Sequence, residues 1–451
     1  SEIVSQGIEG QYAPLHALWG LGQLYRQEAE GSADAIVDAL SAKDPEIRAN
    51  AARVAGDSMV IEAQSDLLKL LSDSSARVVS LSAIALGRVA PKGDEIVVKA
   101  LFAVAKLNQG KGFEVTLRHS LLSALDRVAQ DDQLTSFAKS EEVEQRLLCV
   151  LLLRRRASPE LAQFLEDDSE TVREEAILAI YDTEAMDGPA GQKLLQVNPK
   201  GLPFYHQARL VGACFRVGSI ESAVRLSEFV TSGDLDKEMR GFAIKALSRW
   251  AEPLDTDPVL GHYRPVEASP VSLDEVSGKI GDSFKELLEK EKDPKIASLL
   301  SSFAQKSGLS LDSKTLRKQV ADRKLDPLVR VANLKGLISK GEKEDDSLLL
   351  QLTEDEMELV RAASFGHLIG RDLDPGYALS LKALKEDTFP VARSVLSSLI
   401  LKDSAKVIEI WRNRELDVRP ELWLDVYLAL SQSDDAEPKQ VTATYAAGDP
   451  G

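Results

Sequence analysis

Residues that could perform catalysis or bind a metal ion are few in this sequence and widely spaced. The two cysteines, Cys149 and Cys214, form neither a CxxC pair nor a disulfide framework. The five histidines lie singly along the chain, with no HExxH motif and no pair four residues apart: His16, His119, His206, His262 and His367. We therefore interpret both cysteines as buried small hydrophobic residues, and each histidine as an ordinary surface or core residue.

Motifs that position nucleophiles, phosphates or dinucleotides are also absent. The sequence has no G-x-S-x-G elbow and no Walker phosphate loop, and the pair Gly20 and Gly22 lacks the third glycine of a dinucleotide fingerprint. With 72 acidic residues, neighbouring carboxylates are unavoidable and indicate nothing about acid–base catalysis. The sequence predicts a protein that is not an enzyme and that carries no metal ion or cofactor of its own.

One basic cluster stands out, at Arg154, Arg155 and Arg156. It follows the apolar run of residues 147–153 and precedes Ser158 and Pro159, which are typical of a new helix start. Cations at the end of a helix complement its negative pole, and this is the simpler interpretation of the cluster. The alternative is a site for an anion or for an acidic partner.

Charge and hydropathy narrow the classes of partner. The formal net charge is −17, which disfavours a large contact with nucleic acid or with an anionic membrane surface. The longest purely apolar run, residues 147–153, is far shorter than the ~20 residues that a membrane-spanning helix needs. We expect protein partners, no nucleic acid and no membrane span in this chain.

The elements that would position any site are helices with thin apolar faces. In residues 44–57, Asp44 and Pro45 are typical of a helix start and Gly56 of the position just past a helix end. Between these marks the apolar positions are mostly alanines, including Ala51 and Ala52. Because most helical stability comes from packing an apolar face, such a helix needs close neighbours.

The same pattern of cap, proline or small residue, apolar residue and basic residue recurs along the chain. Clear copies begin at Ser75, Ser169, Asp236, Asp293, Asp326, Met357 and Thr388, and weaker copies lie near residues 113, 141, 203 and 415. The spacings from 44 to 75, from 326 to 357 and from 357 to 388 are each 31 residues. Shorter apolar helices fill the gaps, so we predict an all-α superhelix, or α-solenoid, with two helices per roughly 30 residues.

The phrase D-P-x-[VI]-R-x-x-A resembles the HEAT-repeat family, and the likeness covers nearly the whole chain. It implies an armadillo-type α-α superhelix of about a dozen helical repeats. For function it implies a scaffold for other proteins, a role that such arrays have in many settings.

The period is interrupted between the copies at Asp236 and Asp293. Residues 250–271 contain four prolines, which exclude a long helix. One interpretation is a joint between two solenoid halves, with residues 1–250 and 273–437 as the halves and 251–272 as the loop. The other is a docking loop, because Trp250, His262, Tyr263 and Arg264 are residue types that anchor protein contacts.

Two phrases carry a narrower resemblance. Residues 14–24, "PLHALWGLGQL", and the W-A-E-P and V-L-G-H-Y-R-P phrases of the loop resemble the HEAT segment of membrane-bound dehydrogenases of planctomycete and verrucomicrobial type. In that family a β-propeller resembling sugar dehydrogenases precedes the repeats and a c-type cytochrome domain follows them. The resemblance implies an extracytoplasmic or periplasmic scaffold that positions these two neighbours for electron transfer.

The ends of the sequence fit this resemblance. The chain begins at Ser1 without Met, and its final "AAGDPG" resembles the phrase that opens the cytochrome domain, so we expect residues 438–451 to be a linker toward a missing domain. No CxxCH occurs here, and haem c is expected only in that domain. Two alternatives stay open: a free-standing adaptor for an unrelated protein and, more remotely, a HEAT-like DNA glycosylase or bilin lyase, which the charge of −17 disfavours.

Overall fold

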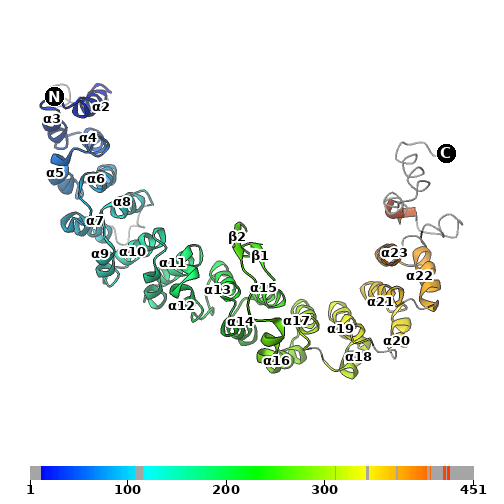
Figure 1. Cartoon of the computed structure of the whole chain (residues 1–451). Coiled ribbons are helices and arrows are strands. Elements are labelled where there is room, and N and C mark those ends of the chain that lie inside the picture. The colour runs from blue at the N-terminus through cyan, green and yellow to red at the C-terminus, as the bar shows by residue number, and fades with distance from the viewer. Residues whose placement is uncertain are drawn as a thin grey trace, which may run out of the picture. The chain divides into compact units, whose positions relative to one another are not determined.

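The computed structural model describes residues 12–107, 115–250, 252–309, 311–341, 345–371, 374–403, 407, 420–422 and 424–426. Its fold is an all-α superhelix, in which pairs of helices follow one another along the chain (Figure 1). The chain divides into two compact units, one of Ser1–Ala213 with Asp257–His262 and one of Cys214–Thr256 with Tyr263–Gly451. This division falls within helix α13, earlier than the boundary at residue 250 that the prolines suggest. The predicted linker at 438–451 lies outside the described residues.

The repeated pattern forms one series of helices, which we call the template helices. They are α2 (Ala13–Arg26), α4 (Pro45–Ser58), α6 (Ala76–Val89), α8 (Val115–Val128), α10 (Val143–Arg155), α11 (Glu170–Tyr181), α13 (Phe204–Val217), α15 (Lys237–Ser248), α17 (Pro294–Lys306), α19 (Pro327–Ser339), α21 (Glu358–Gly370) and α23 (Phe389–Lys402). In the first unit each template helix from α2 to α10 packs on the next template helix. In the second unit α15, α17, α19, α21 and α23 pack on one another in the same order.

The second series consists of partner helices that cover the template helices. They are α3 (Ser32–Ala39), η1 (Ile61–Ala63), α5 (Gln64–Leu70), α7 (Glu95–Leu107), α9 (Asp131–Phe137), η2 (Pro159–Glu166), η3 (Glu184–Asp187), α12 (Pro189–Leu194), α14 (Ile220–Ser232), α16 (Leu273–Lys290), α18 (Ser313–Ala321), α20 (Asp345–Leu352) and α22 (Asp374–Glu386), followed by the short turn η4 (Pro420–Leu422). None of the helices in the described ranges is both long and apolar enough to cross a membrane.

Helix α4 shows how the local sequence and the packing together define a repeat. Asp44 accepts the backbone N–H of Glu46 at 2.8 Å, as the predicted N-cap, and Pro45 occupies the first turn. The expected role of Gly56 as an end mark is wrong, because α4 continues to Ser58. A side chain on Gly56 would place its Cβ 2.8 Å from the Cα atom of Ala85 in α6, so this glycine permits close helix contact.

The thin apolar faces are buried between consecutive template helices. Ala51, Ala52 and Ala83 are completely buried, and the Gly87 backbone lies so close to α8 that a Cβ there would be 2.5 Å from the Cα atom of Ala124. Small side chains let the helices approach each other, and the buried area of each repeat is therefore shared with its neighbours.

A second, directional contact joins consecutive repeats. The arginine four residues after the N-cap of one template helix bonds to the acidic residue one or two positions before the N-cap of the next. We call these contacts the inter-repeat ion pairs. They are Arg48–Asp73, Arg146–Asp167, Arg240–Glu291, Arg330–Asp355 and Arg361–Asp387.

The pair of Arg48 and Asp73 illustrates the geometry. The guanidinium donates to both carboxylate oxygens, at 2.7 and 3.0 Å, while Asp73 also accepts the backbone N–H of Ser75 at 2.8 Å, just before α6. The bond from Arg48 lowers the pKa of Asp73 although burial opposes this shift. The carboxylate thus ties the arginine of one repeat to the helix start of the next.

The pair of Arg330 and Asp355 is the most deeply buried of the five. Their side chains are 1% and 3% exposed, with N–O distances of 2.6 and 3.1 Å, and the Nε atom of Arg330 donates to the carbonyl of Val320 at 2.8 Å. A guanidinium can be buried at such depth only because its donors are satisfied in this way.

We predict opposite effects of the same substitution at two glycines. Gly87→Ala should lower the free energy of unfolding by about 1–3 kcal/mol, because the new methyl group overlaps α8. Gly20→Ala, in helix α2 with no described atom within 4 Å of the added Cβ, should raise stability by roughly 0.5–1 kcal/mol. Thermal unfolding of both variants tests this; destabilisation of equal size would refute the close-approach argument.

We also predict that a buried ion pair contributes more to the free energy of unfolding than an exposed one. Arg330→Ala should lower the free energy of unfolding by about 3–5 kcal/mol, because it leaves the carboxylate of Asp355 buried without its partner. Arg323→Ala breaks the exposed pair with Glu356, whose side chains are 60% and 77% exposed, and should change stability by less than about 0.5 kcal/mol. Urea unfolding of the two variants provides the comparison. Similar losses would show that the buried pair has no special role.

Candidate docking hairpin

The proline-rich segment forms a two-stranded antiparallel hairpin rather than a helix pair. Strands β1 (Leu254–Thr256) and β2 (Tyr263–Val266) pair Leu254 with Val266 and Thr256 with Tyr263, as Figure 1 shows beside α15. The described residues 252–271 contain no helix, which confirms the prediction from the prolines. The strands belong to the second compact unit, whereas the tip, Asp257–His262, belongs to the first.

The base of the hairpin is buried. Trp250 is 2% exposed, and its ring meets that of Phe215 edge to face, with centroids 6.1 Å apart and an interplanar angle of 87°. The hypothesis that Trp250 docks a partner is therefore wrong, because the indole is not accessible. Its role is to fill the core at the place where the helical period is interrupted.

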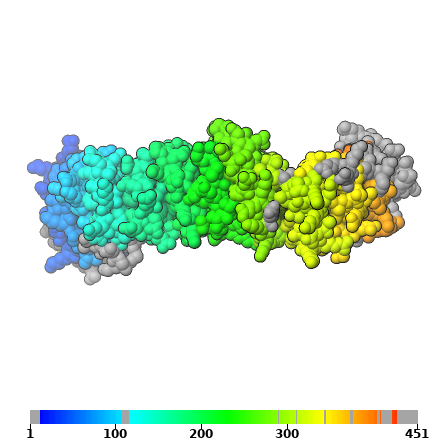
Figure 2. All heavy atoms as spheres, turned by 90° about the horizontal axis from the view of Figure 1, so that it is seen from below, coloured from blue at the N-terminus to red at the C-terminus, as the bar shows by residue number. Residues whose placement is uncertain are grey.

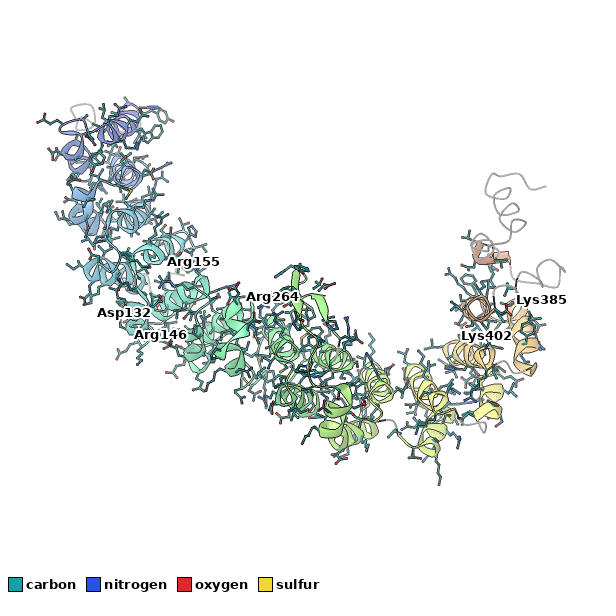
Figure 3. The ribbon with its side chains drawn as sticks, viewed as in Figure 1. Asp132, Arg146, Arg155, Arg264, Lys385 and Lys402 are labelled. Carbon is teal, nitrogen blue, oxygen red and sulfur yellow. The ribbon has the colours of Figure 1, made fainter. Side chains whose placement is uncertain are left out.

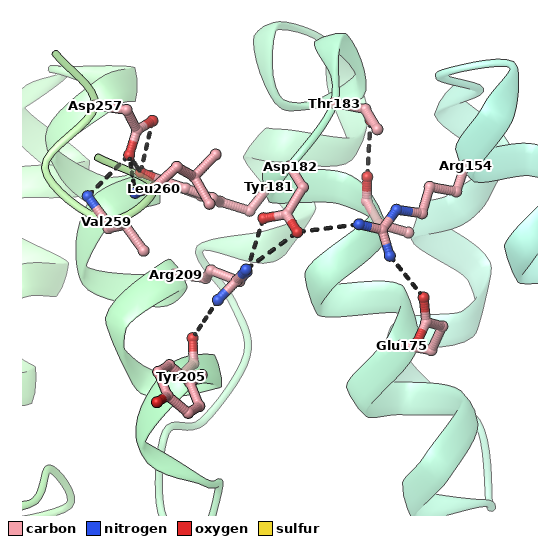
Figure 4. Close-up of polar contacts among 11 residues, drawn as sticks. Arg154, Glu175, Tyr181, Asp182, Thr183, Tyr205, Arg209, Asp257, Val259 and Leu260 are labelled. Atoms are coloured by element: carbon pink, nitrogen blue, oxygen red, sulfur yellow. Dashed lines mark hydrogen bonds and ion pairs between the residues drawn. The ribbon is translucent and has the colours of Figure 1, made fainter. Parts of the chain in front are cut away.

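The tip is held by a buried carboxylate. Asp257 is completely buried and accepts the hydroxyl of Tyr181, at 3.0 and 3.2 Å from its two oxygens, and the backbone N–H groups of Val259 and Leu260, each at 2.9 Å (Figure 4). A Cβ on Gly212 of α13 would lie 2.4 Å from the Tyr181 hydroxyl oxygen. The tip thus packs closely on α11 and α13 within the first unit.

Tyr181 and Asp257 are not among the site residues predicted from the sequence. Asp257 precedes Pro258, and Gly261, three residues after the proline, has a φ of 72°. This combination is typical of a turn that is closed by the aspartate side chain. That local signal was present in the sequence. The contact with Tyr181, 76 residues earlier, was not visible without the fold.

The three other predicted docking residues lie near the start of β2. Tyr263 is 78% exposed, His262 at the end of the tip is exposed, and Arg264 is half-buried, with its carbonyl accepting a bond from Arg216 at 3.4 Å. Arg264 is labelled on the hairpin in Figure 3, and residues around 260 protrude from the surface in Figure 2. Strand pairing therefore fixes the backbone of Tyr263, whereas its side chain remains exposed to solvent.

The three arginines of the cluster form ion pairs with carboxylates of the same chain. Arg154 bonds to Glu175 at 2.8 Å and to Asp182 at 3.2 Å, and Asp182 also accepts two bonds from Arg209 (Figure 4). Arg155, at the opposite end of α10 from Arg146 (Figure 3), lies 3.3 Å from Asp126.

The third member of the cluster, Arg156, pairs with Asp131 and donates to the carbonyl of Ala129 at 3.1 Å. An external anion would have to compete with these internal acceptors. The geometry therefore favours the simpler interpretation, that the cations complement a helix end.

The cysteines and histidines, all of which lie in the described ranges, are spread over several helices and the hairpin. Cys149 and Cys214 are completely buried, as predicted, and burial raises the pKa of the Cys214 thiol to about 12 and that of Cys149 further. Burial lowers the pKa of His206 and of His367, which favours their neutral forms. Within the described part of the chain, no group of three or more His, Cys, Asp or Glu residues could hold a metal ion.

Comparison with known proteins agrees with the fold. No family model matches the chain, and no curated protein matches it. Among solved structures, the karyopherin Kap121p bound to Ste12p matches with a TM-score of 0.50 at 14% identity, over 95% of this chain and 49% of that chain. Kap121p bound to Pho4p matches with a TM-score of 0.49 at the same identity and coverage. The chain thus spans about half the length of these structures, and the likeness shows the fold alone, a HEAT-type α-solenoid.

We predict that the hydroxyl of Tyr181 stabilises the tip. Tyr181→Phe should lower the free energy of unfolding by about 1–3 kcal/mol, because the buried carboxylate of Asp257 loses a hydrogen bond. Tyr205→Phe removes a hydroxyl from a side chain that is 71% exposed and should change stability by less than about 0.5 kcal/mol. Thermal unfolding of both variants is the measurement, and equal midpoints would contradict the proposed role of the hydroxyl.

Proposed function

We propose that this chain is a non-catalytic protein-interaction scaffold that binds a protein neighbour through Tyr263 on strand β2. The observation that carries the proposal is the combination of a backbone held by strand pairing and a tyrosine side chain that is 78% exposed. Tyrosine combines a large apolar ring with a polar tip and has few rotatable bonds, so it loses little conformational entropy when a partner covers it.

The fold supports the same proposal. Stacked helical repeats offer a long surface built from many similar elements, a property that suits the binding of proteins rather than of small substrates. The Kap121p structures with the same fold hold other proteins, Ste12p and Pho4p. Because fold alone does not define function, this likeness adds weight only to the general role.

In its finer form the proposal names the neighbours. The phrases at 14–24 and within the hairpin resemble the HEAT segment of membrane-bound dehydrogenases, so we propose a β-propeller and a c-type cytochrome domain of the same extracytoplasmic polypeptide as the partners. In that arrangement the haem would supply the redox chemistry and this chain the placement of the two domains.

We predict that Tyr263→Ala weakens binding to one of these domains at least tenfold without changing the thermal midpoint of the chain. The expected loss follows from the central role of aromatic anchors in interfaces. Calorimetric titration of the chain with each separately expressed domain measures it. Tyr205→Ala, on a tyrosine of α13 that is 71% exposed, is the matched control and should bind normally.

Two results would contradict the proposal. Unchanged affinity of Tyr263→Ala would show that the hairpin is only a structural joint. A reading frame with no CxxCH beyond residue 451 would exclude the cytochrome neighbour and favour a free-standing adaptor, for which the same titration is performed with proteins captured by the chain.

A further inference from the structure

One junction of the second unit lacks its inter-repeat ion pair. The position four residues after the N-cap of α17, where the five pairs have arginine, is Ala297. Two positions before the N-cap of α19, where most of the pairs have an acid, the residue is Lys324. The junctions on either side are complete, with Arg240–Glu291 before it and Arg330–Asp355 after it.

A cavity of about 410 Å³ lies at this junction. Ala297 and Lys324 both line it, together with Glu291 and Lys292, which stand six and five residues before Ala297. In the complete junctions of Arg48, Arg146 and Arg361, the carbonyls of the residues at these two positions accept bonds from the arginine. The cavity thus occupies the place that the guanidinium fills elsewhere, and its size is within the range of sites for small ligands or single side chains.

The charges around the cavity are not balanced. Glu291 is already bound to Arg240 at 2.7 Å and to the backbone N–H groups of two following residues, and Asp326 caps α19 by accepting the N–H of Leu328. In contrast, neither Lys292 nor Lys324 has an ion-pair partner among the residues that the structure describes. With Glu291 paired to Arg240, the two lysines of the lining face only the carboxylate of Asp326, so one positive charge is left over and favours an anionic occupant.

Polar groups at one wall of the cavity can add hydrogen bonds. Ser301 donates to the side-chain oxygen of Asn333 at 3.0 Å, and the Asn333 amide donates to the oxygen of Gln319 at 3.0 Å. Asn333 is 3% exposed, and this chain of bonds orients its amide. The amide hydrogens of Gln319 are not used by any described residue, so they remain donors for an oxygen of a ligand.

The rest of the lining is apolar, with Leu288, Leu311 and Leu325 among its residues. A bare inorganic anion would leave these side chains in contact with water. An occupant with a short aliphatic group next to its negative charge would cover them and would gain from burial of apolar surface.

We propose that this cavity binds a carboxylate carried on a short branched aliphatic group, held by Lys324, Lys292 and the amide of Gln319. Two sources share this chemistry: a free branched-chain carboxylic acid, or an acidic side chain beside a leucine in a protein segment. Lys324 supplies the main charge, because it replaces the acid that closes the other junctions.

The test uses the full chain and two probes, 4-methylpentanoate and the peptide N-acetyl-Leu-Glu-Leu-amide, each titrated with NMR detection. At least one probe should bind saturably, and 4-methylpentanamide, which lacks the charge, should bind at least fivefold more weakly than the acid. Lys324→Ala should weaken the better probe at least fivefold. Lys279→Ala, an exposed lysine earlier on α16, should leave binding unchanged.

A double variant provides a second measurement. Ala297→Arg with Lys324→Asp restores the ion pair, fills the cavity and should abolish binding while raising the thermal midpoint. If this variant does not fold, the titration of Lys324→Ala alone tests the proposal. Binding of the free acid but not of the peptide identifies a small molecule as the source, and the reverse identifies a protein segment. Failure of both probes, or binding that is equal in wild type and Lys324→Ala, would overturn the proposal.

Discussion

The guanidinium–carboxylate contact between consecutive repeats is the interaction on which the remaining structure depends. The alanine and glycine faces of the template helices allow close approach, but apolar contact has no preferred direction. The two-pronged bond from Arg48 to Asp73 does have one, and the same carboxylate then receives the start of the next helix. At the five junctions with such a pair, one arginine therefore positions the next repeat, and burial of Arg330 is tolerated only because Asp355 and the carbonyl of Val320 satisfy it.

The hairpin is held by a contact between residues that are far apart in the sequence. Template helices contact their neighbours in the chain, whereas Asp257 meets Tyr181 across 76 residues. Closing a long connection of this kind costs more conformational entropy than a contact between neighbouring helices. The three hydrogen bonds donated to the buried carboxylate of Asp257 offset this cost. The result is an irregular element, held at its base and at its tip, in an otherwise regular array.

The sequence alone was sufficient for the repeated parts of the fold and insufficient for the exceptions. The 31-residue spacing predicted the template helices, and Asp44 was identified as a cap, because both signals are local. Gly56 was misread, since the approach of Ala85 is a tertiary contact. Among the docking candidates, residue type alone could not separate buried Trp250 from exposed Tyr263, because both are aromatic residues in one proline-rich segment.

The junction between α17 and α19 has a mechanical consequence. Its neighbours on both sides are joined by the ion pairs Arg240–Glu291 and Arg330–Asp355, but this junction has no such pair and depends on apolar packing and on neutral hydrogen bonds such as Ser301 to Asn333. Neutral hydrogen bonds are weaker than charge-assisted ones, so we expect the repeats of the second unit to shift relative to each other most readily at this junction. Strain applied to the array would be absorbed there, with little distortion of the repeats on either side.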